Sequence, residues 1–376
     1  MKSISLLVTL FGLLLSTVTS TAATRSDAGL LKIFWLATHA STLIALPDGT
    51  VILIDSGNAD RPDTNGGTCA DRICNVIIQE LKTNVIHHYI STHWHNDHIG
   101  GIGASDFNGK IVNSPRRVTV RQMYGRTNSA SITNTALDQF KRYTATENLS
   151  LNKATTIVKL GDTIYSNKWN GHTIKLTVVA VNGLTVNDSA REQSHNFCSP
   201  NGDNTELENR NSIALMLSVD NFRYLDTGDL WCEVAGRLFQ GAGELAGGVD
   251  VYRTAHHGGS DSNPDGLFTI ARPSVVILNN GVDDRQAGPK ELRKRLKRLL
   301  DPKTMLYQLY LNQGESDADD SSSLVAVRNS DLRANKAQHC FITLTYPIGG
   351  KNYSVITHHV GPRTNYFSIR DKGHSR

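Results

Sequence analysis

The sequence predicts an α/β protein in which short apolar strands alternate with amphipathic helices. Apolar stretches recur between turn-forming residues, and they are typical of strands. Other segments repeat apolar residues at helical spacing. The predicted strands are 31–46, 51–54, 85–91, 173–181, 212–219, 222–226, 249–254, 275–279, 340–346 and 353–359. The predicted helices are 73–81, 135–143, one between 254 and 275, and 289–300.

Local signals justify these elements in order. The turn at 47–49 joins the first two strands, and apolar residues at 73, 77, 78 and 81 indicate a helix. Asp220 and Asn221 form the turn of a hairpin, and 187–209 is a polar loop. Helix 289–300 carries leucines on one face and six basic residues on the other. Without an internal repeat or linker, residues 24–376 form one predicted domain.

The first 23 residues predict a secretory signal peptide. Lys2 precedes an apolar core over 6–15, and small residues follow at 20–23. No later stretch reaches the roughly 20 apolar residues of a spanning helix, which indicates a secreted or periplasmic protein without a stable membrane anchor. Hydrophobic and charged contents of 39% and 20% suit a globular protein. A net charge of +4 neither requires nor excludes a polyanionic substrate.

Five cysteines are compatible with export but too few for a disulfide scaffold. Cys69 and Cys74 are close enough in sequence to close a small loop. Cys198 and Cys232 are candidates for a second pair, which would leave Cys340 free. The pairing stays open at this point. No Cys-x-x-Cys pair is present, so the sequence does not favour metal binding by cysteine.

The strongest functional signal is the segment 93–98, His-Trp-His-Asn-Asp-His, which follows a predicted strand directly. His93 and His95 alternate along extended backbone, so both side chains face one side. Asp97 and His98 fall in the turn that follows, where they reach a second ion, and two glycines allow close approach of the next helix. Imidazole and carboxylate together suit zinc or another divalent first-row metal.

This segment resembles the HxHxDH hallmark of the metallo-β-lactamase superfamily. The resemblance implies a four-layer αββα sandwich, with two mixed β-sheets flanked by helices. It also implies two divalent metal ions, zinc or alternatively manganese, and a metal-activated water. Asp55, which closes strand 51–54, matches an aspartate that supports the metal-binding histidines from behind.

The resemblance assigns the remaining site residues from two later segments. The metal-bridging aspartate is Asp229, with Asp226 as the alternative, and His257 is the last ligand. The implied metal ligands are thus His93, His95, Asp97, His98, Asp229 and His257. Asp97 would also orient the attacking water, and His256 would contact a substrate oxygen or protonate the leaving group.

One branch of the superfamily is favoured by the combined pattern Asn211-Ser212, Thr227-Gly228-Asp229 and His256-His257-Gly258. The pattern resembles the hydrolase domain of bacterial DNA-uptake channel proteins and the phosphorylcholine esterase of pneumococcal cell walls. It implies hydrolysis of phosphodiester or phosphoester bonds, in nucleic acid, teichoic acid or phosphocholine compounds. A groove formed by the basic helix 289–300 would suit such a substrate, although a solvated basic face is the commoner explanation.

The chain departs from the superfamily pattern at one ligand. Many members carry a histidine between the hexapeptide and the bridging aspartate, and only His172 and His195 are available here. His172 starts a strand and is predicted to be a surface residue, whereas His195 lies in the polar loop and stays open as a ligand. The resemblance to the favoured branch implies a site that works without this histidine and has a more open first metal. The pairs at 87–88 and 358–359 are predicted to be ordinary strand residues.

Two other functions stay open. A β-lactamase or lactonase of the same fold would have a pocket for a small ring and little sensitivity to salt. A secreted binding module without turnover would ordinarily have lost a ligand. Because every expected ligand except the middle histidine is present, the sequence favours an enzyme.

Overall fold

The computed structural model describes thirteen stretches of the chain. They are 29–58, 69–102, 118–126, 155–187, 207–238, 245, 247–259, 262–281, 289–299, 303–310, 325–327, 341–358 and 363–370. The predicted signal peptide, the predicted helix 135–143 and most of the polar loop lie outside these residues. Among the described residues, no helix has the length and apolar character needed to cross a membrane.

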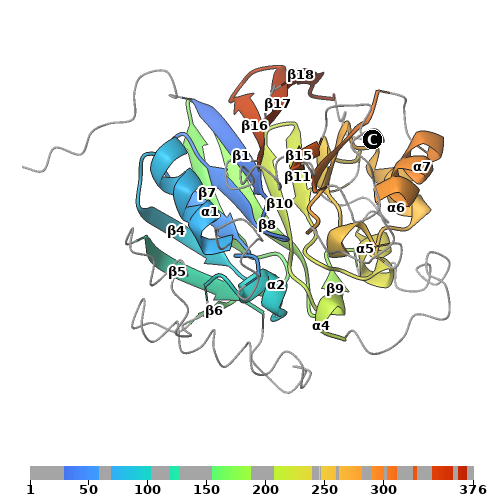
Figure 1. Ribbon diagram of the computed structural model, residues 1–376, viewed down its shortest axis with the longest axis horizontal. Coiled ribbons are helices and arrows are strands. Elements are labelled where there is room, and N and C mark those ends of the chain that lie inside the picture. The colour runs from blue at the N-terminus through green and yellow to red at the C-terminus, as the bar shows by residue number, and fades with distance from the viewer. Residues whose placement is uncertain are drawn as a thin grey trace, which may run out of the picture.

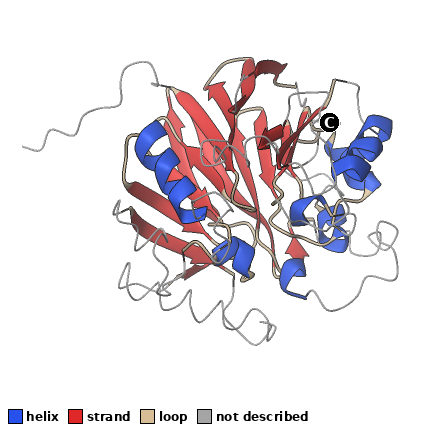
Figure 2. Ribbon diagram, viewed as in Figure 1, coloured by secondary structure: helices blue, strands red, loops and turns tan. Residues whose placement is uncertain are grey.

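Two mixed β-sheets face each other at the centre of the molecule (Figures 1 and 2). The first sheet has the order β18 (Arg363–Ser368), β17 (Asn352–His358), β16 (Phe341–Pro347), β1 (Leu30–Leu36), β2 (Thr42–Ala45), β3 (Val51–Ile54), β4 (Val85–Ile90), β5 (Thr119–Gly125), β6 (Thr156–Ile157). The second has the order β15 (Val325–Val327), β14 (Met305–Tyr310), β13 (Val275–Leu278), β12 (Val251–Arg253), β11 (Phe222–Asp226), β10 (Ala214–Val219), β8 (His172–Val181), β7 (Thr163–Trp169), with β9 (Leu184–Thr185) beside β8.

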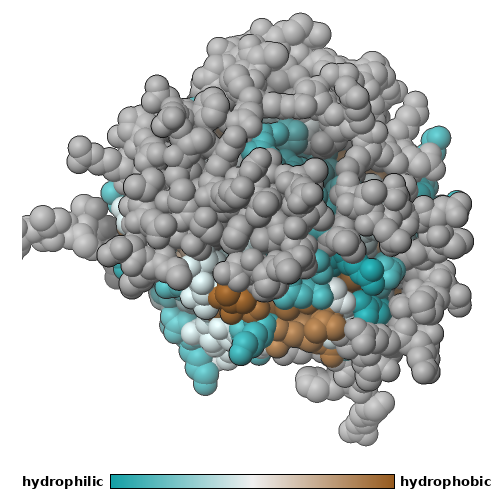
Figure 3. Space-filling view, turned by 90° about the horizontal axis from the view of Figure 1, so that it is seen from below, coloured by the Kyte–Doolittle hydropathy of each residue, from teal (hydrophilic) through white to brown (hydrophobic). Residues whose placement is uncertain are grey.

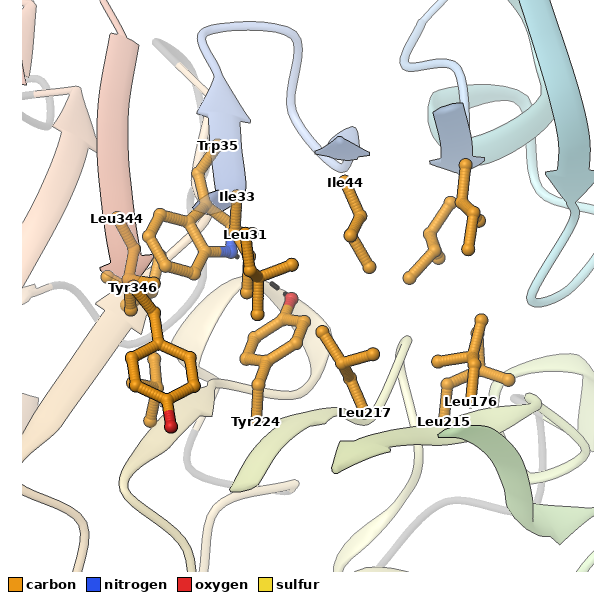
Figure 4. Packing of buried hydrophobic residues seen from close by; sticks show 14 of the residues in the cluster. Leu31, Ile33, Trp35, Ile44, Leu176, Leu215, Leu217, Tyr224, Leu344 and Tyr346 are labelled. Carbon is orange, nitrogen blue, oxygen red and sulfur yellow. Dashed lines mark hydrogen bonds between the residues drawn. The ribbon is translucent and has the colours of Figure 1, made fainter. Parts of the chain in front are cut away.

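Three apolar clusters define four layers. The largest fills the space between the sheets, where the indole of Trp35 donates a 3.2 Å hydrogen bond to the hydroxyl of Tyr224 (Figure 4). The second packs α1 (Cys69–Asn75) and its π-helical extension (Val76–Glu80) on the outside of the first sheet. The third packs α5 (Cys232–Arg237), α6 (Asp265–Ala271) and α7 (Pro289–Leu299) on the outside of the second sheet (Figure 1). The predicted αββα sandwich is confirmed.

Most of the predicted elements are found within one or two residues of their expected ends. The main exception is the segment 31–46, predicted as one strand, which is two antiparallel strands, β1 and β2, with a loop over 37–41. No glycine or proline marks this loop in the sequence. A second difference concerns Asp97 and His98, which lie in the short helix α2 (Asn96–Ile99) rather than in a turn before it.

The glycines after the hexapeptide lie at the end of α2 rather than at the start of a following helix, and Gly101 is required by a close approach there. A β-carbon on Gly101 would lie 2.2 Å from the carbonyl oxygen of Ser56, at the end of β3. Glycine therefore allows α2 and the residues after it to pack directly against the end of that strand.

Of the two candidate disulfides, the one between Cys69 and Cys74 is not formed. Cys69 and Cys74 are separate buried thiols with no disulfide between them, although both lie in α1. Burial raises the pKa of the Cys69 thiol to about 12, because the thiolate would lose its hydration. Cys232 is disulfide-bonded, and its partner lies outside the described residues.

The basic helix is present as α7, and its leucines behave as predicted. Leu292 and Leu296 are buried and Leu299 packs against the same cluster. On its other face, Arg295 and Arg298 contact Asp265 at 2.8 and 2.7 Å. These two charges are therefore partly neutralised within the protein.

The surface of the described part exposes few large apolar side chains. On the face seen from below, hydrophobic residues form a small patch bordered by hydrophilic ones (Figure 3). Across the described residues, the exposed large apolar side chains are Ile157, Leu184, Val186 and Tyr366.

Candidate metal centre

The predicted site residues follow the carboxyl ends of parallel strands from both sheets. Strands β3 and β4 run parallel in the first sheet, and β11, β12 and β13 run parallel in the second. The two sets of strand ends are joined by a 2.9 Å hydrogen bond from the amide of Ile213 to the carbonyl oxygen of Thr92. Residues far apart in the sequence therefore meet at one edge of the sandwich.

Four side chains form a compact candidate metal-binding cluster: Asp97, His98, Asp229 and His257. Each offers one ligand atom, and these atoms all lie within 4.8 Å of one another. Nε2 of His257 is 3.0 Å from Asp97 Oδ2, and Nε2 of His98 is 3.1 Å from Asp229 Oδ2. Ligand atoms placed about 2 Å from one ion would be separated from one another by similar distances.

His93 and His95 form a second pair of ligand atoms beside this cluster. Nε2 of His93 lies 3.1 Å from Nδ1 of His95, and the rings of His93 and His98 have centroids 4.0 Å apart. Two nitrogens at this separation suit neighbouring positions around one tetrahedral ion. Among the described residues this pair has no third ligand that would complete a cluster of its own.

Asp55 holds the histidine ligands from behind. Its carboxylate accepts hydrogen bonds from the amide and hydroxyl of Thr92, both at 2.8 Å, and lies 2.7 Å from Nδ1 of His98. The Thr92 hydroxyl also lies 3.1 Å from Nδ1 of His93. Because the rear nitrogens are engaged, Nε2 of both histidines is directed toward the cluster.

His257 is oriented by an unusual turn. His256 and His257 are both in the left-handed backbone region, with φ of 47° and 52°. Such strain persists only where surrounding contacts impose it. Asn263 supplies them, because its side chain bonds the amide and carbonyl of Ala255 at 3.1 and 2.7 Å. Nδ1 of His257 donates to the carbonyl oxygen of Asn279 at 3.0 Å, so its Nε2 faces Asp97.

Of the two candidate bridging aspartates, only Asp229 lies in the cluster. Asp226 instead forms a fully buried ion pair with Arg253 at 3.1 Å and accepts hydrogen bonds from Tyr224 and Thr42. Arg253 also donates to the carbonyl oxygen of Gly228, so the pair shapes the turn that presents Asp229.

Two residues that the sequence did not single out, Glu208 and Asn209, make further contacts with residues at this edge of the sandwich. Glu208 is fully buried, accepts a 3.0 Å hydrogen bond from the amide of Trp94 and pairs with the guanidinium of Arg126. Its neighbour Asn209 lies 3.2 Å from Nε2 of His256 through its amide nitrogen. Both are in the short helix α4 (Leu207–Arg210) within the predicted polar loop, and no sequence pattern marks them.

The other described histidines that the sequence singled out lie outside the cluster. His172 pairs with Asp220 in the exposed hairpin, as expected of a surface residue. His87 and His88 bond Val51 and Tyr124 within the first sheet, and His358 stacks on Phe341. His195 and His359 lie outside the described residues. Trp94 is buried and packs against Gly125, where a β-carbon would lie 2.7 Å from the indole.

The electrostatics of the cluster favour a cation. Burial opposes ionisation of Asp229 and Asp97, yet the neighbouring His98 and His257 rings hold the pKa of both carboxyls well below the usual value. Burial likewise opposes a proton on His98, but Asp229, Asp55 and Asp97 raise its pKa well above the usual value. The buried Oδ1 of Asp229 has no hydrogen-bond partner among the described residues. A divalent ion fits this donor set and satisfies that oxygen.

Metal binding is expected to release protons. Without metal, the raised pKa of His98 keeps its ring protonated near pH 7, so a metal must displace that proton. Zinc affinity should therefore rise with pH through neutrality, with release of about one proton at this site. Calorimetric titration in two buffers of different ionisation enthalpy measures the release. An affinity independent of pH, without released protons, would contradict the assignment of His98 as a ligand.

Comparisons with known proteins assign this chain to no family. Neither the models of known protein families nor the curated protein sequences match this chain. A structure from Parabacteroides distasonis, provisionally described as a metal-dependent hydrolase, aligns over 74% of this chain and 93% of its own, with 12% identity and a TM-score of 0.37. ETHE1 from Myxococcus xanthus aligns over 76% of this chain and 77% of its own, with 15% identity and a TM-score of 0.26. At such scores neither similarity carries information about substrate.

Proposed function

We propose that this protein is a metal-dependent hydrolase that attacks phosphodiester or phosphoester bonds with a metal-activated water. The observation that carries the proposal is the cluster of Asp97, His98, Asp229 and His257 at the meeting edge of the two sheets. Three of the four side chains are buried, and Asp97 is partly exposed. The partial exposure of Asp97 leaves the cluster open to solvent on one side, as a site that binds water or substrate requires.

Asp97 and His256 are assigned different chemical roles in the proposed reaction. Divalent ions held here would supply a nucleophilic water at neutral pH and polarise the scissile group. Asp97, the partly exposed member, would accept a hydrogen bond from that water and orient it. His256 lies beside His257, with ring centroids 6.0 Å apart, and is assigned to contact a substrate oxygen or protonate the leaving group.

We propose two zinc ions of unequal affinity, with manganese as the alternative metal. The cluster of four provides a complete ligand set, whereas His93 and His95 provide only two described ligand atoms of their own. A third ligand for this pair is not found among the described residues, and His195 lies outside them. The second ion should therefore bind more weakly than the first and leave more positions for water or substrate.

The phosphoester preference rests on the pattern of residues around the cluster. Ser212, from the Asn-Ser pair, accepts a 3.3 Å hydrogen bond from the amide of Asp229 and so supports the backbone of that ligand. The basic face of α7 contributes less support, because Asp265 already engages Arg295 and Arg298. Nucleic acid, teichoic acid and phosphocholine compounds are the candidate substrates.

We also propose that the protein is secreted or periplasmic. The predicted signal peptide over residues 1–23 is one support. The disulfide at Cys232 is a second, since disulfides form and persist in oxidising compartments.

A metal-supplemented hydrolysis panel tests the proposed function. The substrates are bis-p-nitrophenyl phosphate, single-stranded DNA, a phosphocholine ester and a chromogenic cephalosporin, each with zinc or manganese. We expect a metal-dependent rate that is highest on the phosphoesters. Fast cephalosporin hydrolysis with inert phosphoesters would instead support the β-lactamase or lactonase alternative. Full metal occupancy without turnover on any substrate would support a binding module.

His256→Ala is expected to lower turnover by about a hundredfold, the usual contribution of a group that transfers a proton or contacts the transition state. The bound metal should remain, because Nε2 of His256 is directed to Asn209 rather than to the cluster. Steady-state kinetics together with elemental analysis measure both quantities.

The adjacent substitution His257→Ala is the control for His256→Ala. It removes a ligand atom 3.0 Å from Asp97, so both metal and activity should be lost. If His256→Ala lost the metal and His257→Ala kept it, the two roles would be reversed.

A further inference from the structure

The loop over 37–41 lies at the metal centre, although the sequence predicts unbroken strand there. Strands β1 and β3 both pair antiparallel with β2, so the end of β1 and the end of β3 lie at the same edge of the sheet. Asp55 follows β3 at that edge and bonds His98. The loop after β1 therefore reaches the same edge as the candidate metal ligands.

Hydrogen bonds from three neighbouring elements, and a close approach by a fourth, hold this loop in place. Arg72 of α1 and the hydroxyl of Tyr310 in β14 both donate to the carbonyl oxygen of Ala37. The carbonyl oxygen of Thr38 lies 2.2 Å from the position a β-carbon would take on Gly57, after β3. Asn279, after β13, donates to the carbonyl oxygen of Ser41 at 3.4 Å. The loop is fixed before any ligand binds, which lowers the entropic cost of recognition.

His39 occupies the centre of this loop in a strained conformation. Its φ of 74° is in the left-handed region, which costs energy for a residue with a β-carbon. Such conformations gather at functional sites, where the surrounding structure imposes them. The side chain of His39 is only partly buried.

The ring of His39 is positioned by two residues of the site edge. It meets the ring of His257 edge to face, with centroids 6.3 Å apart and planes at 88°. A β-carbon on Gly281 would lie only 1.9 to 2.6 Å from three ring atoms of His39, so the ring occupies the space that any other residue at 281 would need. The imidazole of this partly buried residue is therefore held against His257, a ligand of the metal cluster.

We propose that His39 is a substrate contact, whose imidazole N–H donates a hydrogen bond to an anionic oxygen of the phosphoryl group. This proposal rests on the proposed function. His39 brings an imidazole from the first sheet against His257, whose Nε2 lies 3.0 Å from Asp97 in the metal cluster, so the ring adjoins the place where a substrate oxygen would meet the metal. Gly281 is the positioning residue for that ring.

Two substitutions test separately whether phosphate binding needs the His39 ring and whether it needs the position of that ring. His39→Asn removes the ring and keeps a residue that tolerates the left-handed conformation. Gly281→Ala keeps the ring but displaces it, because all three closest contacts of the new β-carbon are atoms of that side chain. His172→Asn, in the exposed hairpin, is the matched control.

The probe is inorganic phosphate, titrated calorimetrically into each zinc-loaded protein, together with KM for bis-p-nitrophenyl phosphate. We expect His39→Asn and Gly281→Ala each to weaken phosphate binding at least about tenfold, as for loss of a hydrogen bond to a charged group. KM should rise with them, while the zinc content and thermal midpoint stay near those of the wild type. The double variant should bind phosphate no more weakly than His39→Asn alone.

Several outcomes would overturn the proposal. They are unchanged phosphate affinity in His39→Asn, loss of zinc from that variant, a further loss in the double variant, or zinc-loaded wild type that binds no phosphate. Phosphoester hydrolysis by the wild type with an unaffected His39→Asn would count against this inference alone. Phosphate binding that depends on His39, without hydrolysis of any phosphoester, would count against the proposed function alone.

Discussion

Asp229→Asn is expected to abolish hydrolysis and to release metal from the protein. Asp229 Oδ2 lies 3.1 Å from Nε2 of His98 and 3.5 Å from Nε2 of His257, so its carboxylate is central to the cluster. The amide of asparagine is nearly the same size but lacks the charge that balances a divalent ion. A loss of several kcal/mol of transition-state stabilisation predicts a rate reduced by about a thousandfold or more. Steady-state kinetics and elemental analysis measure the two effects.

The control for Asp229→Asn is Asp220→Asn, which removes the same charge from an exposed hairpin turn. That variant should retain both metal and rate. Retention of full metal occupancy and turnover by Asp229→Asn would contradict the bridging role of Asp229.

Asp226→Asn is expected to destabilise the fold by about 3–5 kcal/mol, because it leaves the buried guanidinium of Arg253 without its counter-charge. Both side chains are fully buried, and their closest nitrogen and oxygen are 3.1 Å apart. The carboxylate also accepts hydrogen bonds from Tyr224 at 2.8 Å and Thr42 at 3.0 Å. Equilibrium unfolding in urea measures the loss, which should appear as a lower transition midpoint.

A double-mutant cycle provides the control for Asp226→Asn. Arg253→Met removes the unpaired charge, so the double variant should be less destabilised than the sum of the two single variants. Additive losses would show that the two side chains do not interact. Metal content should fall less in folded Asp226→Asn than in Asp229→Asn.

The sequence was most informative for those metal ligands that lie close together in the chain. Four of the six predicted ligands lie within residues 93–98, and the preceding strand β4 was recognisable from its apolar residues. Alternation along extended backbone was enough to place His93 and His95 together. Helical backbone places His98 over the end of β3, where Asp55 meets it, and this pairing was also expected from the resemblance.

The contacts that support the ligands were less accessible to prediction because they are non-local. Glu208 meets Trp94 across more than a hundred residues, and nothing in its neighbourhood distinguishes it from an exposed glutamate. The choice between Asp229 and Asp226 likewise depended on Arg253, which pairs with one of them from the next strand. Sequence spacing alone does not reveal which acidic residue a distant guanidinium will reach.

The loop over 37–41 escaped prediction for a different reason. Its residues are small or β-compatible and include no turn-forming glycine, so the stretch resembles a continuous strand. The turn is imposed by tertiary contacts, among them those of Arg72 and Tyr310 with Ala37. These contacts outweigh the local preference for a continuous strand. His39 consequently takes a left-handed backbone conformation that a residue with a β-carbon disfavours.

Metal analysis of the purified mature protein is the most direct test of the proposed metal centre. The protein is stripped with a chelator, reconstituted with zinc, dialysed and measured by elemental analysis alongside Asp229→Asn. We expect up to two zinc ions per chain in the wild type, one held tightly by the cluster of four and one more weakly, and a clear loss in the variant. A wild-type protein that retains no metal after reconstitution, while remaining folded, would contradict the metal centre and the proposed enzyme.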